Sequence, residues 1–305
     1  MALTLILQQE LQKAIRGNLR FNEPMREHTT IKIGGPADIW VEPLDIEDLL
    51  SAVRWADDND VPRSVFGNGS NTLVRDEGKR GMVISLKNFS HVILSEAKDP
   101  VSAVVGAGVN LQQLLSWTVE HSFTGLEPLA GIPGTLGGAL IMNAGVKDGT
   151  IADAVKSIKY VTKNRKVTVE KEDLEFSYRK LKLPKGVIVV EAELVFGSGD
   201  KAEIETKIQK RRKERGEIQP ILWPNMGSIF KNPGGASKAW ELIDECGLRG
   251  VRVGGARVSN EHANWIVNEG RATAKDVEVL IKLIKEKVKD KSGVLLETEI
   301  IITGE

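Results

Sequence analysis

The sequence has little cysteine and histidine. Its 305 residues contain one cysteine, Cys246, and four histidines. A lone cysteine forms no intrachain disulfide, and neither it nor the scattered histidines make the clusters that hold a metal ion. The sequence therefore predicts a protein of the reducing cytoplasm without a metal site.

Excess charge of either sign is also lacking. The 42 basic and 42 acidic residues give a formal net charge of +0. Without a net positive field the chain is not expected to bind nucleic acid, so local groups must meet any anionic ligand. The hydrophobic share of 41% and the charged share of 28% are typical of a folded, soluble protein.

No apolar run is long enough to span a membrane. The N-terminal stretch MALTLILQQELQKAIRG has no basic region before its short apolar part, so we interpret it as neither signal peptide nor anchor. Leu3, Ile6, Leu7, Leu11 and Ile15 recur at helical spacing before Gly17, which predicts an amphipathic packing helix.

The length favours two or three compact units. Short β-branched runs predict strands over 61–66, 81–86 and 101–105, and a helix begins after Asp45. A second helix over 111–122 leads into the glycine-dense segment 125–145, where no regular element is expected. A hairpin is predicted over 155–171 and a buried strand over 187–196. Together these elements make up the part of the chain before residue 200.

The last third of the sequence, from about residue 201, has the pattern of an α+β domain. A charged helix over 202–215 precedes a loop rich in proline and glycine at 219–235. A later helix is capped by Thr273, and a strand is predicted over 294–302. The apolar stripe of that helix is Val277, Leu280, Ile281, Ile284 and Val288.

Four short glycine segments allow close approach to the backbone: IGGPAD at 33–38, GNGSN at 67–71, GAG at 106–108 and GIPGTLGG at 131–138. Successive amides in such turns suit a pyrophosphate. None is a Rossmann fingerprint, and no Walker A lysine is present. Each alone is equally well explained as a tight turn, but four in one block favour a nucleotide-containing ligand.

Two of these segments resemble parts of a known cofactor-binding domain. GNGSN followed by Thr72, and GLEPLAGIPGTLGGALIMNAG at 125–145, are similar to the FAD-binding domain of the vanillyl-alcohol-oxidase (PCMH) type. The resemblance implies bound FAD in a two-lobed domain. The cofactor-binding residues that it implies are Gly67, Asn68, Gly69, Ser70, Asn71, Gly131, Pro133, Gly134, Thr135, Gly138, Asn143 and Gly145.

Four more segments resemble, in order and spacing, the UDP-N-acetylenolpyruvoylglucosamine reductase (MurB) family: SYRK at 177–180, GSIFKNP at 227–233, GGARVSNEHANWIVN at 254–268 and LETEI at 296–300. The resemblance implies NADPH-dependent, FAD-mediated reduction of UDP-N-acetylglucosamine enolpyruvate to UDP-N-acetylmuramate for peptidoglycan. It further implies a cytoplasmic monomer that binds neither membrane nor nucleic acid.

The same resemblance implies the catalytic residues. Ser228 is expected to donate the proton, and Arg179 and Glu299 to stabilise the enolate. Arginine offers a permanent charge to a carboxylate, and a buried glutamate with a raised pKa could donate a hydrogen bond. Glu297 is not the expected catalytic glutamate, because the family pattern matches the later glutamate of LETEI. Without the resemblance, Ser228 is far better explained as a turn residue, Arg179 as a surface ion-pair partner and Glu299 as a solvated strand residue.

Substrate-binding residues are expected at Tyr178, Lys231, Asn232 and His262, with Lys231 also a candidate to stabilise a serine alkoxide. The segment after Asn143 lacks the tyrosine of some members, which implies the branch without the tyrosine loop (type II). Lys180 and Leu181 follow the Tyr-Arg pair where serine is frequent, and Ile218 stands where lysine is frequent.

We expect an α+β protein with a helix over 1–21, FAD-binding lobes over 22–85 and 86–200, and a substrate domain over 201–305. The last strand either stays in that domain or returns to the first lobe. Two alternatives remain open: another FAD-dependent oxidase or dehydrogenase of the same superfamily, and a noncatalytic nucleotide-sugar sensor that kept the fold.

Overall fold

The computed structural model describes residues 5–98, 101–235 and 237–305. The chain forms two compact units and passes between them several times. The first unit comprises residues up to 21, 39–68 and 81–214, and the second comprises 22–38, 69–80 and 215–305. Each unit is thus assembled from segments far apart in sequence, and the domain boundaries expected above stay a prediction.

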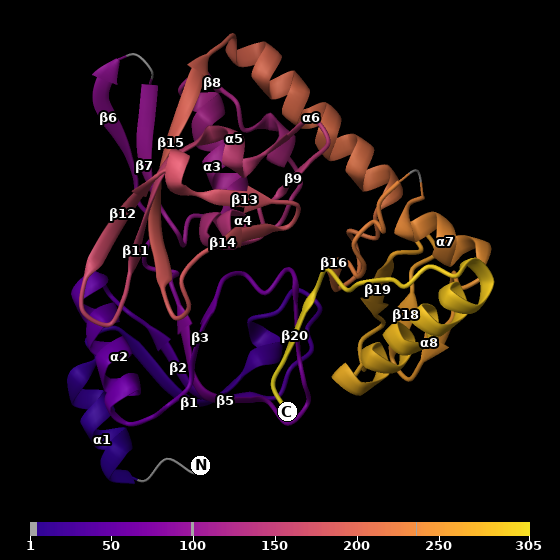
Figure 1. The fold of residues 1–305 in the computed structure, drawn as a ribbon, viewed down its shortest axis with the longest axis horizontal. Coiled ribbons are helices and arrows are strands. Elements are labelled where there is room, and N and C mark those ends of the chain that lie inside the picture. Colours follow the sequence, from indigo (N-terminus) through magenta and orange to yellow (C-terminus); the bar gives the residue numbers. More distant parts are fainter. Residues whose placement is uncertain (1–4, 99–100, 236) are drawn as a thin grey trace. The chain divides into compact units, whose positions relative to one another are not determined.

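The elements mix helix and strand along the whole chain (Figure 1). The α-helices are α1 Leu5–Ala14, α2 Ile46–Asp58, α3 Leu111–Glu120, α4 Leu136–Ile141, α5 Ile151–Ala154, α6 Lys201–Ile218, α7 Ala239–Glu245 and α8 Ala274–Ser292. Three short 3-10 helices are η1 Met25–Glu27, η2 Glu127–Leu129 and η3 Lys171–Asp173. No helix within these described ranges is long and apolar enough to cross a membrane.

The strands are short, apart from β15. They are β1 Asn18–Pro24, β2 Pro36–Glu42, β3 Arg63–Phe66, β4 Thr72–Val74, β5 Lys79–Ser85, β6 Val92–Lys98, β7 Val101–Gly106, β8 Phe123–Thr124, β9 Gly145–Val146, β10 Gly149–Thr150, β11 Val155–Val161, β12 Lys166–Glu170, β13 Glu175–Ser177, β14 Lys180–Lys182, β15 Ile188–Ser198, β16 Asn225–Ser228, β17 Arg252–Val253, β18 Ala256–Val258, β19 Trp265–Asn268 and β20 Ile301–Thr303.

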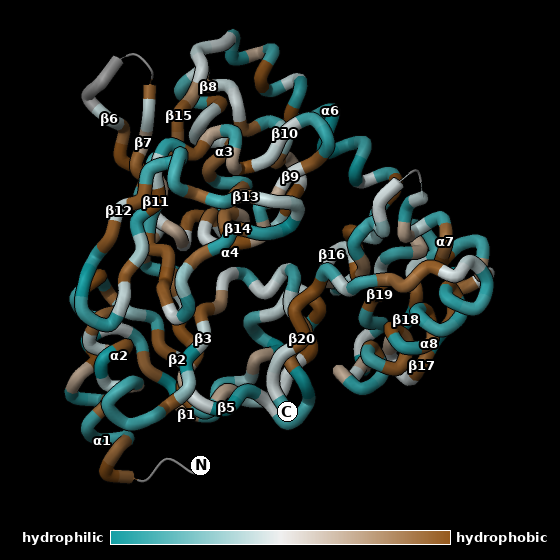
Figure 2. The backbone as a smooth tube through the Cα atoms, in the orientation of Figure 1, coloured by the Kyte–Doolittle hydropathy of each residue, from teal (hydrophilic) through white to brown (hydrophobic). Residues whose placement is uncertain are grey.

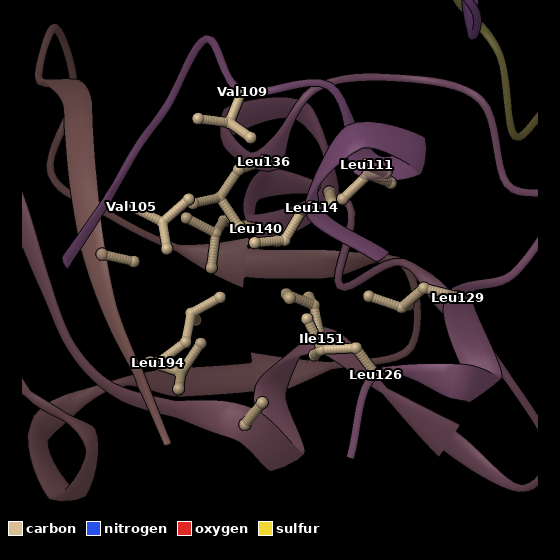
Figure 3. Close-up of a cluster of buried hydrophobic side chains, with 14 of the residues drawn as sticks. Val105, Val109, Leu111, Leu114, Leu126, Leu129, Leu136, Leu140, Ile151 and Leu194 are labelled. Carbon is tan, nitrogen blue, oxygen red and sulfur yellow. The ribbon is translucent and has the colours of Figure 1, made fainter. Parts of the chain in front are cut away.

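The larger sheet of the first unit is antiparallel, with the order β12-β11-β15-β7-β6 and β8 joined to β15. Leu194 of β15 lies opposite Ala103 of β7, and both are fully buried. Helices α3, α4 and α5 bury their apolar residues against this sheet, as the close-up of the core shows (Figure 3). Hydrophobic residues recur along β11 and β15, whereas much of α6 is hydrophilic (Figure 2).

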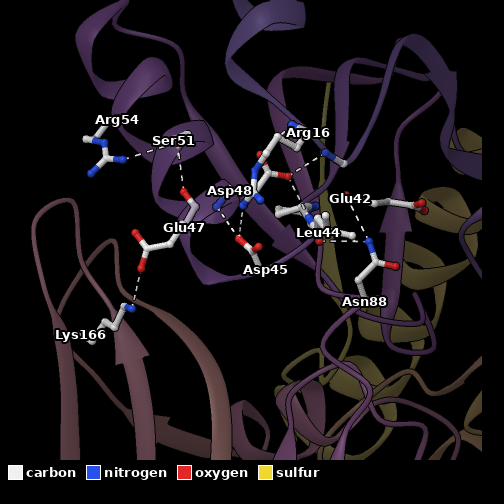
Figure 4. Close-up of polar contacts among 12 residues, drawn as sticks. Arg16, Glu42, Leu44, Asp45, Glu47, Asp48, Ser51, Arg54, Asn88 and Lys166 are labelled. Atoms are coloured by element: carbon white, nitrogen blue, oxygen red, sulfur yellow. Dashed lines mark hydrogen bonds and ion pairs between the residues drawn. The ribbon is translucent and has the colours of Figure 1, made fainter.

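A second sheet has the order β1-β2-β5-β3, with β3 parallel to β5. The helix before β3, α2, is capped by Asp45, whose carboxylate accepts from the Asp48 N–H at 2.9 Å. Asp48, 1% exposed, in turn accepts from the N–H groups of Arg16 and Gly17, both at 2.8 Å (Figure 4). Gly17 must be glycine, because a Cβ there would lie 2.1 Å from the Glu42 carbonyl oxygen. These bonds fix the N-terminal segment to α2.

The second unit contains the antiparallel sheet β16-β19-β18-β17 and a separate parallel pair, β20 with β4. Helix α8 buries the predicted stripe from Val277 to Val288 in the core of this unit. A capping box between Thr273 and Asp276 begins the helix, and Gly293, with φ 74°, ends it. The helix predicted from this stripe and cap is therefore confirmed.

Two expectations about local structure are wrong. Residues 294–302 do not form one strand, because only Ile301–Thr303 is regular and Thr298 makes an isolated bridge to Phe230. The glycine-rich segment 125–145 does contain a helix, α4. Contacts from outside the segment hold it, since Leu136 N–H donates to the Val109 carbonyl and Gly137 N–H to the Ala107 carbonyl, at 2.9 and 2.8 Å.

Candidate active site

Two of the glycine segments have a purely structural explanation. In IGGPAD, a Cβ on Gly35 would lie 2.1 Å from the Asp76 carbonyl oxygen. In GAG, Cβ atoms on Gly106 and Gly108 would lie 2.2 and 2.0 Å from the carbonyl oxygens of Phe89 and Leu86. These glycines let one stretch of backbone pack against another, so the tight-turn interpretation accounts for both segments.

The other two segments come together around Thr135. A Cβ on Gly67 would lie 2.8 Å from Thr135 Oγ1, and one on Gly138 would lie 3.6 Å from the same atom. Thr135 caps α4 by accepting from the Gly138 N–H at 3.4 Å. Gly131 and Gly134 have φ 77° and 138°, which glycine adopts readily. These residues of the first unit thus form a surface with little side chain between a ligand and the backbone.

Asn143 and Gly145 follow this loop and meet the turn that carries Arg179. Asn143 is 9% exposed and donates Nδ2 to the Ser177 carbonyl at 3.1 Å. Arg179 lies in the turn between β13 and β14 with φ 57°, and its Nη1 donates to the Gly145 carbonyl at 3.1 Å. Its guanidinium also lies 5.1 Å from the ring centroid of the exposed Tyr178. Arg179 is therefore held in a defined place in the first unit.

Ser228 ends β16 in the second unit. Gly227, with φ 78°, allows the irregularity between the pairs Asn225–Val267 and Ser228–Trp265. Ser228 lies opposite Trp265 and is half-buried. Asn264 fixes the next residues, because Phe230 N–H donates to its Oδ1 at 3.0 Å and its Nδ2 donates to the Phe230 carbonyl at 2.8 Å.

Glu299 lies beside the same segment. Its N–H donates to the Ile229 carbonyl at 2.8 Å, and its carbonyl accepts from Asn71 Nδ2 at 3.2 Å. The second unit thus brings Ser228 and Glu299 together, whereas Arg179 belongs to the first unit. Glu297, two residues earlier, is 74% exposed in its side chain and pairs with Lys231 Nζ at 2.5 Å.

The other expected substrate residues have partners of their own. Asn232 Oδ1 accepts from the N–H of Ala239, the first residue of α7, at 3.1 Å. Burial, together with the positive charge of Arg249, lowers the pKa of His262 to about 4. His262 Nδ1 accepts from the Asn264 N–H at 3.3 Å. The ring is therefore neutral near pH 7.

Sequence reasoning missed Asn264, Arg249 and Arg257. Asn264 and Arg257 lie inside the quoted segment GGARVSNEHANWIVN, yet nothing in their spacing indicates what they contact. Arg257 is 5% exposed, donates Nε to Glu269 Oε1 at 2.7 Å, and lies 5.8 Å from the Trp223 ring centroid. Hydrogen bonds from Arg252 and Arg257 lower the pKa of Glu269 to about 2.

The residues at the Thr135 loop suit a bound dinucleotide. Small residues surround Thr135, and the Oδ1 atom of Asn143 is buried without a hydrogen-bond partner among the described residues. A buried acceptor of this kind is normally paired, so it could accept from a ligand donor. Within the described part of the chain, no group of three or more His, Cys, Asp or Glu side chains could hold a metal ion.

Comparison with known proteins identifies the class. A family model of an FAD binding domain matches residues 37–169. The chain also aligns with Phl p 4.0202, a glucose dehydrogenase, with a TM-score of 0.50, 17% identity, and coverage of 64% of this chain and 44% of that one, which shows the fold alone. The protein has an FAD-binding domain of the PCMH type, so the predicted fold class and the predicted FAD cofactor are confirmed.

The comparisons also identify the family. A model of the UDP-N-acetylenolpyruvoylglucosamine reductase C-terminal domain matches residues 219–303. The reductase of Geotalea uraniireducens is 45% identical over 96% of this chain and 97% of its own, and that of Desulforamulus reducens is 43% identical over 97% of both. The crystal structure of the Thermus caldophilus reductase (MurB) aligns with a TM-score of 0.78 and 36% identity, covering 94% of this chain and 99% of that one. The chain belongs to the UDP-N-acetylenolpyruvoylglucosamine reductase family and is an oxidoreductase.

Proposed function

We propose that the protein reduces UDP-N-acetylglucosamine enolpyruvate to UDP-N-acetylmuramate with NADPH, in the synthesis of peptidoglycan precursors. The observation that supports this most is the hydrogen bond between Glu299 N–H and the Ile229 carbonyl, which sets the last expected catalytic residue beside Ser228 in a chain with an FAD-binding domain. When bound, FAD supplies the redox step, accepting hydride from NADPH and delivering it to the methylene carbon of the enolpyruvyl group.

Side chains of the protein stabilise the negative charge that develops on the substrate and supply the proton. Delivery of hydride leaves negative charge on the neighbouring carbon and on the substrate carboxylate. Arg179 binds that carboxylate with a planar, permanently charged guanidinium. Glu299, protonated when it acts, donates a hydrogen bond to the developing enolate. Ser228 then transfers its hydroxyl proton to the carbon.

The remaining expected residues bind rather than react. Lys231 leaves its ion pair with Glu297 to meet the substrate or the Ser228 alkoxide, and Tyr178, Asn232 and His262 contact the substrate. His262 is neutral near pH 7, so it contributes hydrogen bonds rather than charge. The residues that would hold FAD are Gly67 to Asn71, the loop from Gly131 to Gly138, Asn143 and Gly145.

We place the protein in the branch without the tyrosine loop, because AGVKDGT follows Asn143 without a tyrosine. We also propose a cytoplasmic monomer that requires no membrane or nucleic-acid partner.

The test is to purify the protein, record its visible spectrum, and follow NADPH oxidation with and without UDP-N-acetylglucosamine enolpyruvate. The proposal predicts a yellow protein whose NADPH oxidation depends on that substrate. A yellow protein that ignores this substrate and NADPH, and whose flavin is reduced by a hydroxy acid and then rapidly reoxidised by oxygen, would support another FAD oxidase. A colourless protein that binds UDP-sugars but no FAD would support the sensor alternative.

A further inference from the structure

Asn143 is a buried asparagine in an unusual backbone conformation. Its side chain is 9% exposed and its φ is 40°, in the left-handed region that residues other than glycine adopt rarely. Its Nδ2 group donates to the carbonyl of Ser177, the last residue of β13. The two residues that follow Ser177 form the turn that carries Arg179, so this hydrogen bond holds the turn at its base.

A second hydrogen bond runs in the opposite direction. Arg179 Nη1 donates to the carbonyl of Gly145, two residues after Asn143, at 3.1 Å. Gly145 packs closely against β10, because a Cβ there would lie 2.3 Å from the Gly149 carbonyl oxygen. Arg179 itself has φ 57°, and a non-glycine residue keeps such a conformation only where its surroundings hold it.

The segment 143–145 and the Arg179 turn are therefore joined by two reciprocal hydrogen bonds within the first unit. The two ends of the Asn143 side-chain amide differ. The NH2 group donates a hydrogen bond to the Ser177 carbonyl, whereas the Oδ1 atom is buried without a partner among the described residues. The sequence predicted a cofactor contact for this residue, and only the oxygen end is open to one.

We propose that Asn143 is a positioning residue for Arg179: its Nδ2 bond to Ser177 fixes the turn so that the guanidinium is presented to the substrate carboxylate. This inference rests on the proposed catalytic role of Arg179. A cation held in place before the reaction binds a developing anion without the cost of reorganising first. Loss of the Asn143 amide would leave the positive charge of Arg179 unchanged but would no longer fix its position.

The test uses Asn143→Gly, because glycine accepts φ 40° while lacking the amide. Asn22→Gly is the matched control: Asn22 also has a positive φ, 54°, but is exposed in β1. In the FAD-loaded protein, reoxidation by saturating substrate should slow about tenfold, and by more than flavin reduction by NADPH slows. Hydrogen exchange should rise in the peptide that spans 174–183 in Asn143→Gly and not in the control.

Combination with Arg179→Ala separates the possible failures. If Asn143 acts through Arg179, Asn143→Gly should slow reoxidation by less than about twofold in the Arg179→Ala background. An equal loss in both backgrounds, or a loss in flavin reduction by NADPH as large as the loss in reoxidation, would overturn the positioning role and leave that of Arg179 intact. Wild-type reoxidation by Arg179→Ala would instead refute the proposed role of Arg179, and the positioning role with it.

Discussion

Glu299 donates its backbone N–H to the carbonyl of Ile229 at 2.8 Å, so the C-terminal segment is fixed directly beside the residue that follows Ser228. A second hydrogen bond runs from the Asn71 side chain, whose Nδ2 donates to the Glu299 carbonyl at 3.2 Å. Two hydrogen bonds to its backbone therefore set the position of Glu299. Glu297, two residues earlier, has an exposed carboxylate that pairs with Lys231.

Substitution of the two glutamates should separate their roles. Glu299→Ala is expected to slow reoxidation of the flavin by substrate about 10²- to 10³-fold, because a hydrogen bond to the enolate is lost. Glu299→Gln should be slowed only about tenfold, since an amide can donate as a protonated carboxyl does. Glu297→Ala is the control and should stay within about threefold. Stopped-flow absorbance of the flavin measures all three rates, and equal losses in Glu299→Ala and Glu299→Gln would contradict the hydrogen-bond role of Glu299.

Glu269 should matter to stability because it is the carboxylate partner of a buried arginine. Glu269→Gln leaves the Arg257 guanidinium, 5% exposed, without its ion-pair partner, and a loss of about 2–4 kcal/mol in the free energy of unfolding is expected. Glu278→Gln removes the exposed ion pair with Arg75 and should cost at most about 0.5 kcal/mol.

Urea denaturation at pH 7 measures the free energy of unfolding of Glu269→Gln and Glu278→Gln. Similar, small losses in the two variants would mean that water reaches Arg257 once Glu269 is gone.

His262 should make stability depend on pH. Its pKa is lowered to about 4 by burial and by Arg249, whereas an unfolded histidine titrates near 6.5. As the pH falls from about 6.5 to 4, the unfolded chain takes up a proton that the folded chain does not. The free energy of unfolding should therefore fall over this window, by at most about 3 kcal/mol. His262→Asn should lose less stability than wild type between pH 7 and 4.5 in urea denaturation.

The exposed His121 provides the matched control. His121→Asn measures how much the same substitution at an exposed histidine changes the free energy of unfolding. A fall of the same size in wild type and His262→Asn would assign the effect to other groups.

The sequence predicted those features that depend on local pattern. The stripe and cap of α8, from Thr273 to Val288, are encoded within one stretch of chain, and the structure confirms them. Helix α4 was missed, because non-local bonds to Ala107 and Val109 stabilise it in a segment whose glycines disfavour a helix. The strand predicted over 294–302 failed because alternation of residues does not supply a pairing partner.

The site shows the same division. Ser228, Arg179 and Glu299 could be named from motifs, because each lies in a short distinctive segment. The contacts of Asn264 with Phe230, and the burial that lowers the pKa of His262, bring together residues distant in sequence. Such contacts have no signature in the spacing of one sequence, so the structure was needed to find them.

The most direct test of the account is reoxidation of the reduced flavin of Ser228→Ala by UDP-N-acetylglucosamine enolpyruvate, followed by stopped-flow absorbance. Ser51→Ala, at a half-buried serine of α2, is the matched control. The account predicts normal FAD content, reduction by NADPH within about twofold of wild type, and reoxidation by substrate slowed at least about 10²-fold in Ser228→Ala alone. Reoxidation of Ser228→Ala at the wild-type rate would contradict the assignment of Ser228 as the proton donor.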